Sequence, residues 1–296
     1  MSAGLVPVFR PGASPLHSAR AGVASSYCAA LALVPIVFEH PMVLGGALVA
    51  VIASGLAAGV GSEMARGARL AMTIGLMITV LNPLLTSEGT TLLVRGDEVL
   101  GQRVGDITLE ALVFGASFGL RAAVLILVFA LYSAVVDPDE MLRLFRRFGY
   151  RSALTASLAT RLVPLLARDA SRMNDAARCR PDPPGRAARA KAAMSGALDR
   201  SVDVAAALEV RGYGDARRPR PAHEPWSRHD VRVAFAALAI AALVVFVGLA
   251  GGGGFVAYPR IVLDTGPLFL ALTFGVVALS LVPWAGAGAR LGVARA

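Results

Sequence analysis

Long apolar runs are the feature that most limits what this chain of 296 residues can fold into. Six of them stand out, at residues 22–38, 41–60, 69–85, 109–136, 231–250 and 267–285. A helix needs about 20 apolar residues to cross the hydrocarbon core of a bilayer. Hydrophobic residues make up 56% of the chain and charged residues only 17%, a balance that a water-soluble domain of this size does not have. We therefore expect an all-α, polytopic membrane protein with about six transmembrane helices.

Proline shortens two of these runs. Pro35 interrupts the first run, and the polar turn Glu39-His40-Pro41 joins it to the second, so the two are predicted to form a hairpin. The third run ends at Asn82-Pro83. The first 20 residues have no apolar core of the signal-peptide type, so we expect the first run to be retained as an anchor.

A basic, helix-rich insert separates the fourth run from the fifth. It divides the chain into an N-terminal membrane domain of about four spans (1–136), cytoplasmic coupling helices (137–228) and a C-terminal membrane domain of about two spans (229–296). Arginine and lysine together number 29, which gives a net charge of +9. Such a charge favours the cytoplasmic side of a membrane, anionic lipid or an acidic partner. Nucleic acid is not expected as a partner, because the insert has almost no aromatic residues between its arginines and the chain is tied to a bilayer.

The distribution of arginines predicts the orientation. If the N-terminus is cytoplasmic, only Arg95, Arg103 and Arg260 lie on the outer side, and the whole insert lies inside. We therefore place both termini and the insert in the cytoplasm of a cell whose plasma membrane holds the spans. The external loop 86–108 alternates turn residues with short β-prone runs and predicts a small hairpin.

Three helices are expected in the insert. The first begins at Asp137-Pro138, ends at Gly149 and is amphipathic, as is typical of a helix at the membrane interface. The second covers about 152–180, with a kink predicted at Pro164. The third covers about 187–211, followed by Gly212 as a C′ residue. One face of this third helix carries Met194, Leu198, Val202 and Ala205.

Both long helices of the insert end in arginine. Arg178 and Arg180 precede a proline-rich break, and Arg211 precedes Gly212. An arginine in a last helical turn is ordinary dipole complementation and capping. Two such ends in one insert favour another interpretation, because a guanidinium group can hold a carboxylate with two hydrogen bonds at a protein interface.

Signals for catalysis or cofactor binding are missing from the sequence. There is no phosphate-binding Gly-x-x-x-x-Gly-Lys-Ser/Thr motif, and the histidines do not stand at metal-ligand spacing. Cys28 and Cys179 fall in different environments, so no disulfide is implied. We expect no catalytic residue, no metal site and no cofactor in this chain.

Several segments together resemble the transmembrane T components of energy-coupling factor (ECF) transporters, the EcfT/CbiQ family. They are Ser14-Pro15-Leu16-His17, Asn82-Pro83-Leu84 with 89–93, 107–111, 161–166, 209–214 and Ala257-Tyr258-Pro259-Arg260. Glu209-Val210-Arg211-Gly212 is similar to the second Ala-Arg-Gly motif of that family, with Val210 in place of alanine. The first motif departs more: spacing from residues 161–166 places its arginine at Arg180, and Arg178 gives an alternative register.

The resemblance implies a non-catalytic coupling subunit of an ATP-driven importer of a micronutrient, either a vitamin or a transition-metal ion. Its partners would be two ATP-binding-cassette ATPases and a substrate-binding membrane (S) subunit. The residues that would couple to the ATPases are Arg180, Arg211, Arg178, Gly212 and Glu209. The ATPases would hydrolyse ATP, and the separate S subunit would recognise the solute.

Two other functions stay open from the residues alone. A membrane-embedded lipid-modifying enzyme needs clustered acids, and the tightest set, Asp137, Asp139 and Glu140, suits the first turn of a helix better. A self-contained transporter needs polar or discontinuous spans at mid-membrane, and few are present.

Polar and small residues inside the fourth run carry two further predictions. Arg121 is expected to pair with a carboxylate or to extend toward the interface. Small residues let helices pack closely or another subunit dock. They are Gly115, Ala116, Ser117 and Gly119.

Overall fold

The structure is a computed structural model that describes residues 12, 14–85, 91–94, 97–99, 102–104, 107–145, 150–182, 184–212, 226–250 and 266–285. The chain forms two compact units. The membrane unit consists of Met1–Met141 and Trp226–Ala296, and the α7–α8 unit consists of Leu142–Pro225. The first and last apolar segments therefore fold together, with the second unit inserted between them.

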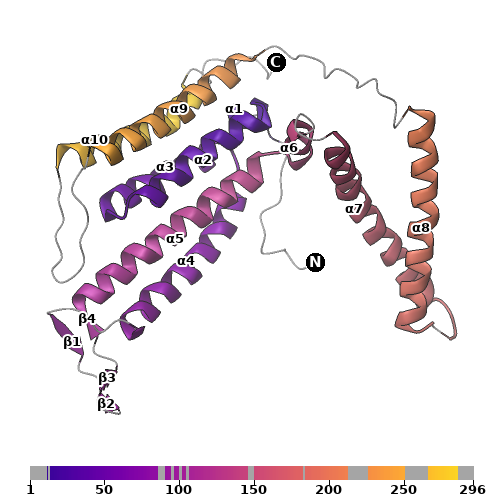
Figure 1. Cartoon of the computed structure of the whole chain (residues 1–296). Helices are drawn as coiled ribbons and strands as arrows, with labels where there is room; N and C mark the ends of the chain where they lie inside the picture. Colours follow the sequence, from indigo (N-terminus) through magenta and orange to yellow (C-terminus); the bar gives the residue numbers. More distant parts are fainter. Residues whose placement is uncertain are drawn as a thin grey trace, which may run out of the picture. The chain divides into compact units, whose positions relative to one another are not determined.

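The membrane unit is built from helices (Figure 1). They are α1 (Pro15–Ser18), α2 (Ala21–Val37), α3 (Pro41–Ala57), α4 (Gly61–Leu85), α5 (Leu109–Val135), the start of α6 (Pro138–Phe145), α9 (Arg228–Leu249), α10 (Pro267–Leu281) and the 3-10 turn η1 (Val282–Trp284). All six apolar runs are helical. Among the described residues, four helices are long and apolar enough to cross a membrane, and α2 and α3 are shorter apolar helices. The predicted all-α, polytopic membrane protein is confirmed.

Three features of the helices differ from the sequence prediction. The third run does not end at Asn82-Pro83, since α4 continues through Pro83 to Leu85. Helix α4 begins at Gly61, before the apolar run at 69, because its charged first turn is satisfied internally. There the fully buried Glu63 accepts hydrogen bonds from Ser62 Oγ and from Arg66 Nη2 at 2.6 Å. The interruption predicted at Pro35 is wrong, since α2 continues through it to Val37. A proline this close to a helix end removes a backbone hydrogen bond where few turns remain to be disrupted.

Helices α4 and α5 lie side by side as a hairpin (Figure 1). Glycines bring their backbones close together: a Cβ atom added at Gly119 would lie 2.5 Å from the carbonyl oxygen of Gly75. Gly115 likewise faces Thr79 and Asn82. The two predicted glycines therefore serve helix packing within the chain, whereas Ala116 is exposed.

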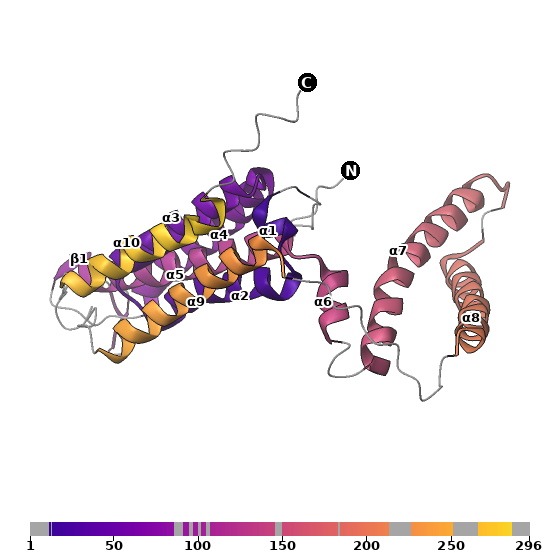
Figure 2. The same cartoon turned by 90° about the horizontal axis from the view of Figure 1, so that it is seen from above.

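The remaining long helices pack as neighbours, α2 against α9 and α3 against α10 (Figure 2). A buried hydroxyl joins three of them. Tyr27 Oη of α2 lies 2.8 Å from Ser54 Oγ of α3 and donates to the carbonyl oxygen of Ser280 in α10 at 2.8 Å. At the same end of α3, Trp284 Nε1 donates to the carbonyl oxygen of Ala57 at 3.0 Å. These bonds fix α3 and α10 in register with α2.

Short strands close the α4–α5 hairpin. Strand β1 (Leu92–Val94) pairs antiparallel with β4 (Ile107–Thr108), and β2 (Asp97–Val99) pairs antiparallel with β3 (Gln102–Val104). The predicted β-hairpin in this loop is confirmed. Glu110 in the first turn of α5 accepts hydrogen bonds from Thr91 N and Thr91 Oγ1, which docks the first strand on the helix.

The α7–α8 unit contains two long helices, α7 (Tyr150–Arg178) and α8 (Arg186–Val210). Their bounds lie within two residues of the predicted ones, and α7 continues through Pro164. Before them, the carboxylate of Asp137 accepts a hydrogen bond from the backbone of Asp139 at 2.9 Å and caps α6, as predicted. The predicted end of that helix at Gly149 lies outside the described residues.

Candidate functional site

Polar contacts join α7 and α8 near the turn between them. Arg200 Nη1 lies 2.6 Å from Asp169 Oδ2, and Arg189 Nη1 donates to Asn174 Oδ1. The partner positions run in opposite directions along the two helices, so the helices are antiparallel. The half-buried residues of α8 share the face that carries these two arginines: Arg189, Ala193, Ala197, Arg200, Val204 and Leu208. This face is turned toward α7.

The end of α7 carries the first pair of candidate arginines. Arg178 is its last helical residue, and the backbone then turns, with Cys179 N bonded to Ala176 O and Arg180 N bonded to Ala177 O, both at 3.3 Å. Arg178 and Arg180 are exposed, whereas Ala177 is buried. Among the described residues, neither guanidinium group has a hydrogen bond or an ion pair.

The end of α8 carries the second candidate arginine. Arg211 is the C-cap, and its backbone N–H points to the carbonyl oxygens of Ala207 and Glu209. Gly212 has φ +76°, and its N–H donates to Glu209 O at 2.9 Å. The prediction of Gly212 as the left-handed C′ residue is confirmed. The side chains of Glu209 and Arg211 are exposed, and within the described part of the chain they form no ion pair.

The two arginine ends are held apart by the length of one helix. Arg178 and Arg180 lie at the turn that leads into α8, whereas Arg211 lies at its far end. Since α8 has 25 residues, these ends are about 37 Å apart at 1.5 Å per residue. They are therefore separate contact points, not two halves of one site.

An apolar stripe on α8 stays uncovered. Met194, Leu198 and Val202 are 68%, 65% and 67% exposed, and Ala205 is also exposed. Their spacing of four residues places the first three on one face, as predicted. This face is not the one turned toward α7. Large apolar side chains left exposed on one face mark a surface for a partner or a lipid.

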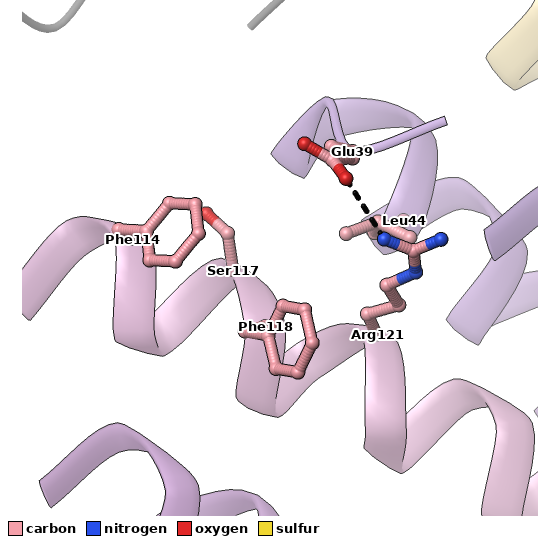
Figure 3. Close-up of a pocket in the computed structure, with 6 residues that line it drawn as sticks. All are labelled: Glu39, Leu44, Phe114, Ser117, Phe118 and Arg121. Atoms are coloured by element: carbon pink, nitrogen blue, oxygen red, sulfur yellow. Dashed lines mark hydrogen bonds and ion pairs between the residues drawn. The ribbon is translucent and has the colours of Figure 1, made fainter. Parts of the chain in front are cut away.

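In the membrane unit, a small pocket surrounds an ion pair (Figure 3). Arg121 Nη1 of α5 lies 2.9 Å from Glu39 Oε1, and Arg121 Nη2 donates to Ile36 O at 2.7 Å. The predicted pairing of Arg121 with a carboxylate is confirmed. The other lining residues are Leu44, Phe114, Ser117 and Phe118. The sequence predicted only that Glu39 lies in the polar turn between the first two apolar runs. It gave no indication that the Glu39 side chain would pair with Arg121 of α5.

The described residues contain no group of three or more His, Cys, Asp or Glu side chains that could hold a metal ion. Cys28 is buried in the membrane unit and Cys179 is exposed in the α7–α8 unit, and both are free thiols. Asp137 caps a helix, which is the role the sequence favoured for it over a metal site.

Comparison with known families gives a match that covers most of the chain. The CbiQ family, described as cobalt transport protein, matches residues 12–222. The chain belongs to the CbiQ family. The match begins before α1 and extends through the whole of α8, so it includes both arginine ends of the α7–α8 unit. A comparison with curated proteins found no match.

Membership in the CbiQ family confirms the resemblance to ECF T components and identifies the chain as a membrane component of a transport system. The family comprises transport components, which makes the lipid-modifying enzyme the weaker alternative. The roles of Arg178, Arg180, Glu209, Arg211 and Gly212 are predictions of the sequence, to which the structure adds their positions at two helix ends.

Proposed function

We propose that this CbiQ-family chain is the coupling subunit of an ATP-driven ECF importer. The observation that carries the proposal is the pair of arginine ends on a compact helical unit inserted into a membrane unit. Exposed guanidinium groups without a partner in the described chain are available to carboxylates on another protein. The subunit itself does not hydrolyse ATP under this proposal, and its partners do.

The spacing of the two ends supports two ATPase contacts. The two arginine ends lie about 37 Å apart along α8. This distance is too long for both ends to enter one groove of a single ATPase subunit. Each end therefore binds a different ATPase subunit, with Arg211 at one and Arg180 or Arg178 at the other. Gly212 follows the C-cap Arg211 and ends α8, because glycine adopts the left-handed conformation that this cap requires. Glu209 supplies the carbonyl oxygen that holds Gly212.

The exposed stripe of α8 supports a third contact. Met194, Leu198 and Val202 offer an apolar face that α7 does not cover. In the proposed importer this face meets the S subunit, whose movement follows the ATPases through α7 and α8. Under the same proposal the α7–α8 unit and both termini are cytoplasmic, and the membrane unit lies in the cell membrane.

The proposed solute is a micronutrient that the S subunit binds. Family membership favours a transition-metal ion, with Co²⁺ as the first to test, and a vitamin is the second class. No residue of this chain is proposed to bind the solute.

Pull-down of the ATPases tests the proposal. The chain with Arg180→Ala and Arg211→Ala should lose ATPase subunits that the unaltered chain retains in mild detergent. Loss of one charged partner from a buried contact typically costs about 2–5 kcal/mol. Arg→Lys should restore binding only in part, because lysine lacks the planar fork. Arg172→Ala is the control, since Arg172 is an exposed arginine within α7.

Uptake in reconstituted vesicles completes the test. Vesicles with this chain, its co-purified ATPases and its S subunit should take up radioactive Co²⁺ or vitamin only with ATP. Full retention of the ATPases and of uptake by the double variant would show that the arginines are helix caps only. Uptake by this chain alone would favour a self-contained transporter.

A further inference from the structure

The chain crosses between its two units twice, and both crossings are attached to the beginning of α2. It leaves the membrane unit after Met141 and returns to it at Trp226. Residues on either side of the α7–α8 unit are therefore the only covalent routes by which that unit can move the membrane unit. Their contacts inside the membrane unit decide which helix is moved.

The returning crossing is bound to Arg20, directly before α2. The backbone N–H of Arg20 donates to Asp230 Oδ1 at 2.8 Å, although 210 residues separate the two. Asp230 is 2% exposed, and its Oδ2 accepts from the backbone N–H of Ser227 at 2.9 Å. Ser227 Oγ accepts in turn from Asp230 N at 3.1 Å, which completes a capping box at the start of α9.

The Arg20 side chain adds two contacts to this crossing. Its Nε lies 3.7 Å from Asp230 Oδ2. Its guanidinium carbon lies 5.7 Å from the ring centroid of Trp226, the first residue after the α7–α8 unit. A guanidinium group over an indole ring is favourable at this distance. Arg20 thus contacts Trp226 and Asp230 directly, and it is connected to Ser227 through Asp230.

The leaving crossing is bound to the next turn of α2. Met141 packs on a small buried cluster formed by Ala21, Ala24 and Val136. Ser25 Oγ lies 3.3 Å from the sulfur of Met141, while its hydroxyl also donates to Ala21 O at 2.6 Å. Within six residues, 20–25, the start of α2 contacts both crossings.

We propose that residues 20–25 are a common anchor for the two crossings, with Arg20 and Asp230 as positioning residues for coupling. The anchor rests on the proposed coupling function and adds the route inside the membrane unit. A displacement of the α7–α8 unit pulls on Met141 and Trp226 together, so the start of α2 moves with both. The anchor passes the movement along α2 to Tyr27, whose hydroxyl is bonded to α3 and α10.

Loosening the anchor should separate ATP hydrolysis from uptake. In vesicles with the full complex, Arg20→Ala keeps the backbone bond to Asp230 but removes the side-chain contacts to Asp230 and Trp226. We expect ATP hydrolysis near that of the unaltered complex, and Co²⁺ uptake per ATP lowered severalfold. Asp230→Asn, which retains one acceptor oxygen, should act in the same direction.

Arg228→Ala is the matched control, because Arg228 is exposed two residues before Asp230 and has no ion pair within the described residues. It should leave the uptake per ATP unchanged. A melting temperature measured for each variant identifies a purely structural effect, which would lower hydrolysis and uptake together. An unchanged uptake per ATP in both Arg20→Ala and Asp230→Asn overturns the anchor.

A crosslink tests whether the contact persists during transport. Ser25→Cys and Met141→Cys, in a chain with Cys28→Ala and Cys179→Ala, can be joined by a short bifunctional thiol reagent. If the anchor moves as one body, the crosslinked complex retains uptake. Loss of uptake with continued ATP hydrolysis means that Met141 must leave α2 during the cycle, and the proposal is then wrong.

Hydrogen exchange separates this proposal from the proposed function. If the unaltered complex shows no ATP-driven uptake, the coupling function fails, and the anchor is judged on the purified chain. Arg20→Ala should speed amide exchange in both 20–25 and 226–231, and Arg228→Ala should speed neither. Exchange that rises in only one of the two segments, or in neither, rejects a common anchor.

Discussion

Arg121 of α5 and Glu39 of the turn between α2 and α3 form an ion pair, with 2.9 Å between Nη1 and Oε1. The guanidinium carbon also lies 5.9 Å from the ring centroid of Phe118. Arg121 stands about 18 Å along α5 from Leu109, at 1.5 Å per residue, which is near the middle of an apolar helix of 27 residues. The short α2–α3 hairpin therefore ends beside the middle of α5, and the pair fastens its turn there.

Removing one member of this pair should destabilise the protein more than removing both. Arg121→Met leaves the carboxylate of Glu39 without its partner beside apolar helices, where a lone charge is costly. The double variant Glu39→Gln/Arg121→Met removes both charges and should melt closer to the unaltered chain. Residues in contact commonly show coupling energies of about 0.5–3 kcal/mol. The melting temperatures of the single and double variants, measured by thermal unfolding in nanodiscs, give the coupling energy of this double-mutant cycle. Strictly additive changes in stability would contradict the coupling.

The glycine contact between α4 and α5 should be intolerant of a single methyl group. Gly119→Ala places a Cβ atom 2.5 Å from Gly75 O, so the helices must separate. Overpacking of this kind costs typically about 1–3 kcal/mol. Gly45→Ala is the matched control, since nothing lies within 4 Å of its Cβ position. The melting temperature should fall for the first variant only, and equal melting temperatures would show that α4 and α5 have room to adjust.

The hydroxyl of Tyr27 should stabilise the membrane unit. Tyr27→Phe removes the hydrogen bonds to Ser54 Oγ and Ser280 O and leaves a buried carbonyl with one partner fewer. An unsatisfied buried polar group costs about 1–3 kcal/mol. Tyr132→Phe removes a hydroxyl with no hydrogen bond in the described structure and serves as the control. A melting temperature lowered equally by both variants would mean that the loss is not due to these bonds.

Local signals in the sequence predict the helices of this protein well. Apolar length predicts α5 and α9, and the proline break after Arg180 predicts the end of α7 to within two residues. Gly212 after Arg211 predicts a left-handed residue, because only glycine adopts that conformation without strain. These signals are contained in a few neighbouring residues, so no tertiary information is needed to interpret them.

The contacts that organise the units are not local, and the sequence does not predict them. Nothing in Arg20 or Asp230 indicates that they meet, and nothing in the sequence indicates that Glu63 is buried in the first turn of α4. The stripe of Met194, Leu198 and Val202 was predicted as a face, but periodicity does not tell whether a face is covered. For the candidate site, the sequence indicated the arginines, and the structure added their separation along α8.

The choice between Arg178 and Arg180 is open to a direct test. Arg211 occupies the cap position of α8, whereas the corresponding cap of α7 is Cys179, with an arginine on either side. Spacing in the sequence favours Arg180. Arg180→Ala should therefore lower ATPase recovery at least about tenfold, for a loss of 1.4 kcal/mol or more, and Arg178→Ala should have a smaller effect. The opposite order would assign the contact to Arg178, and equal effects would mean that both bind.

The native cysteines should report the orientation without engineering. Cys179 is exposed in the α7–α8 unit, and Cys28 is buried in α2. If the arginine-rich unit is cytoplasmic, a membrane-impermeant maleimide should leave intact cells unlabelled and should label inside-out vesicles. Cys179→Ser should abolish that labelling, whereas Cys28→Ala should not change it. Efficient labelling of Cys179 from outside intact cells would reverse the topology and would remove the ATPase contacts from the side where ATP is available.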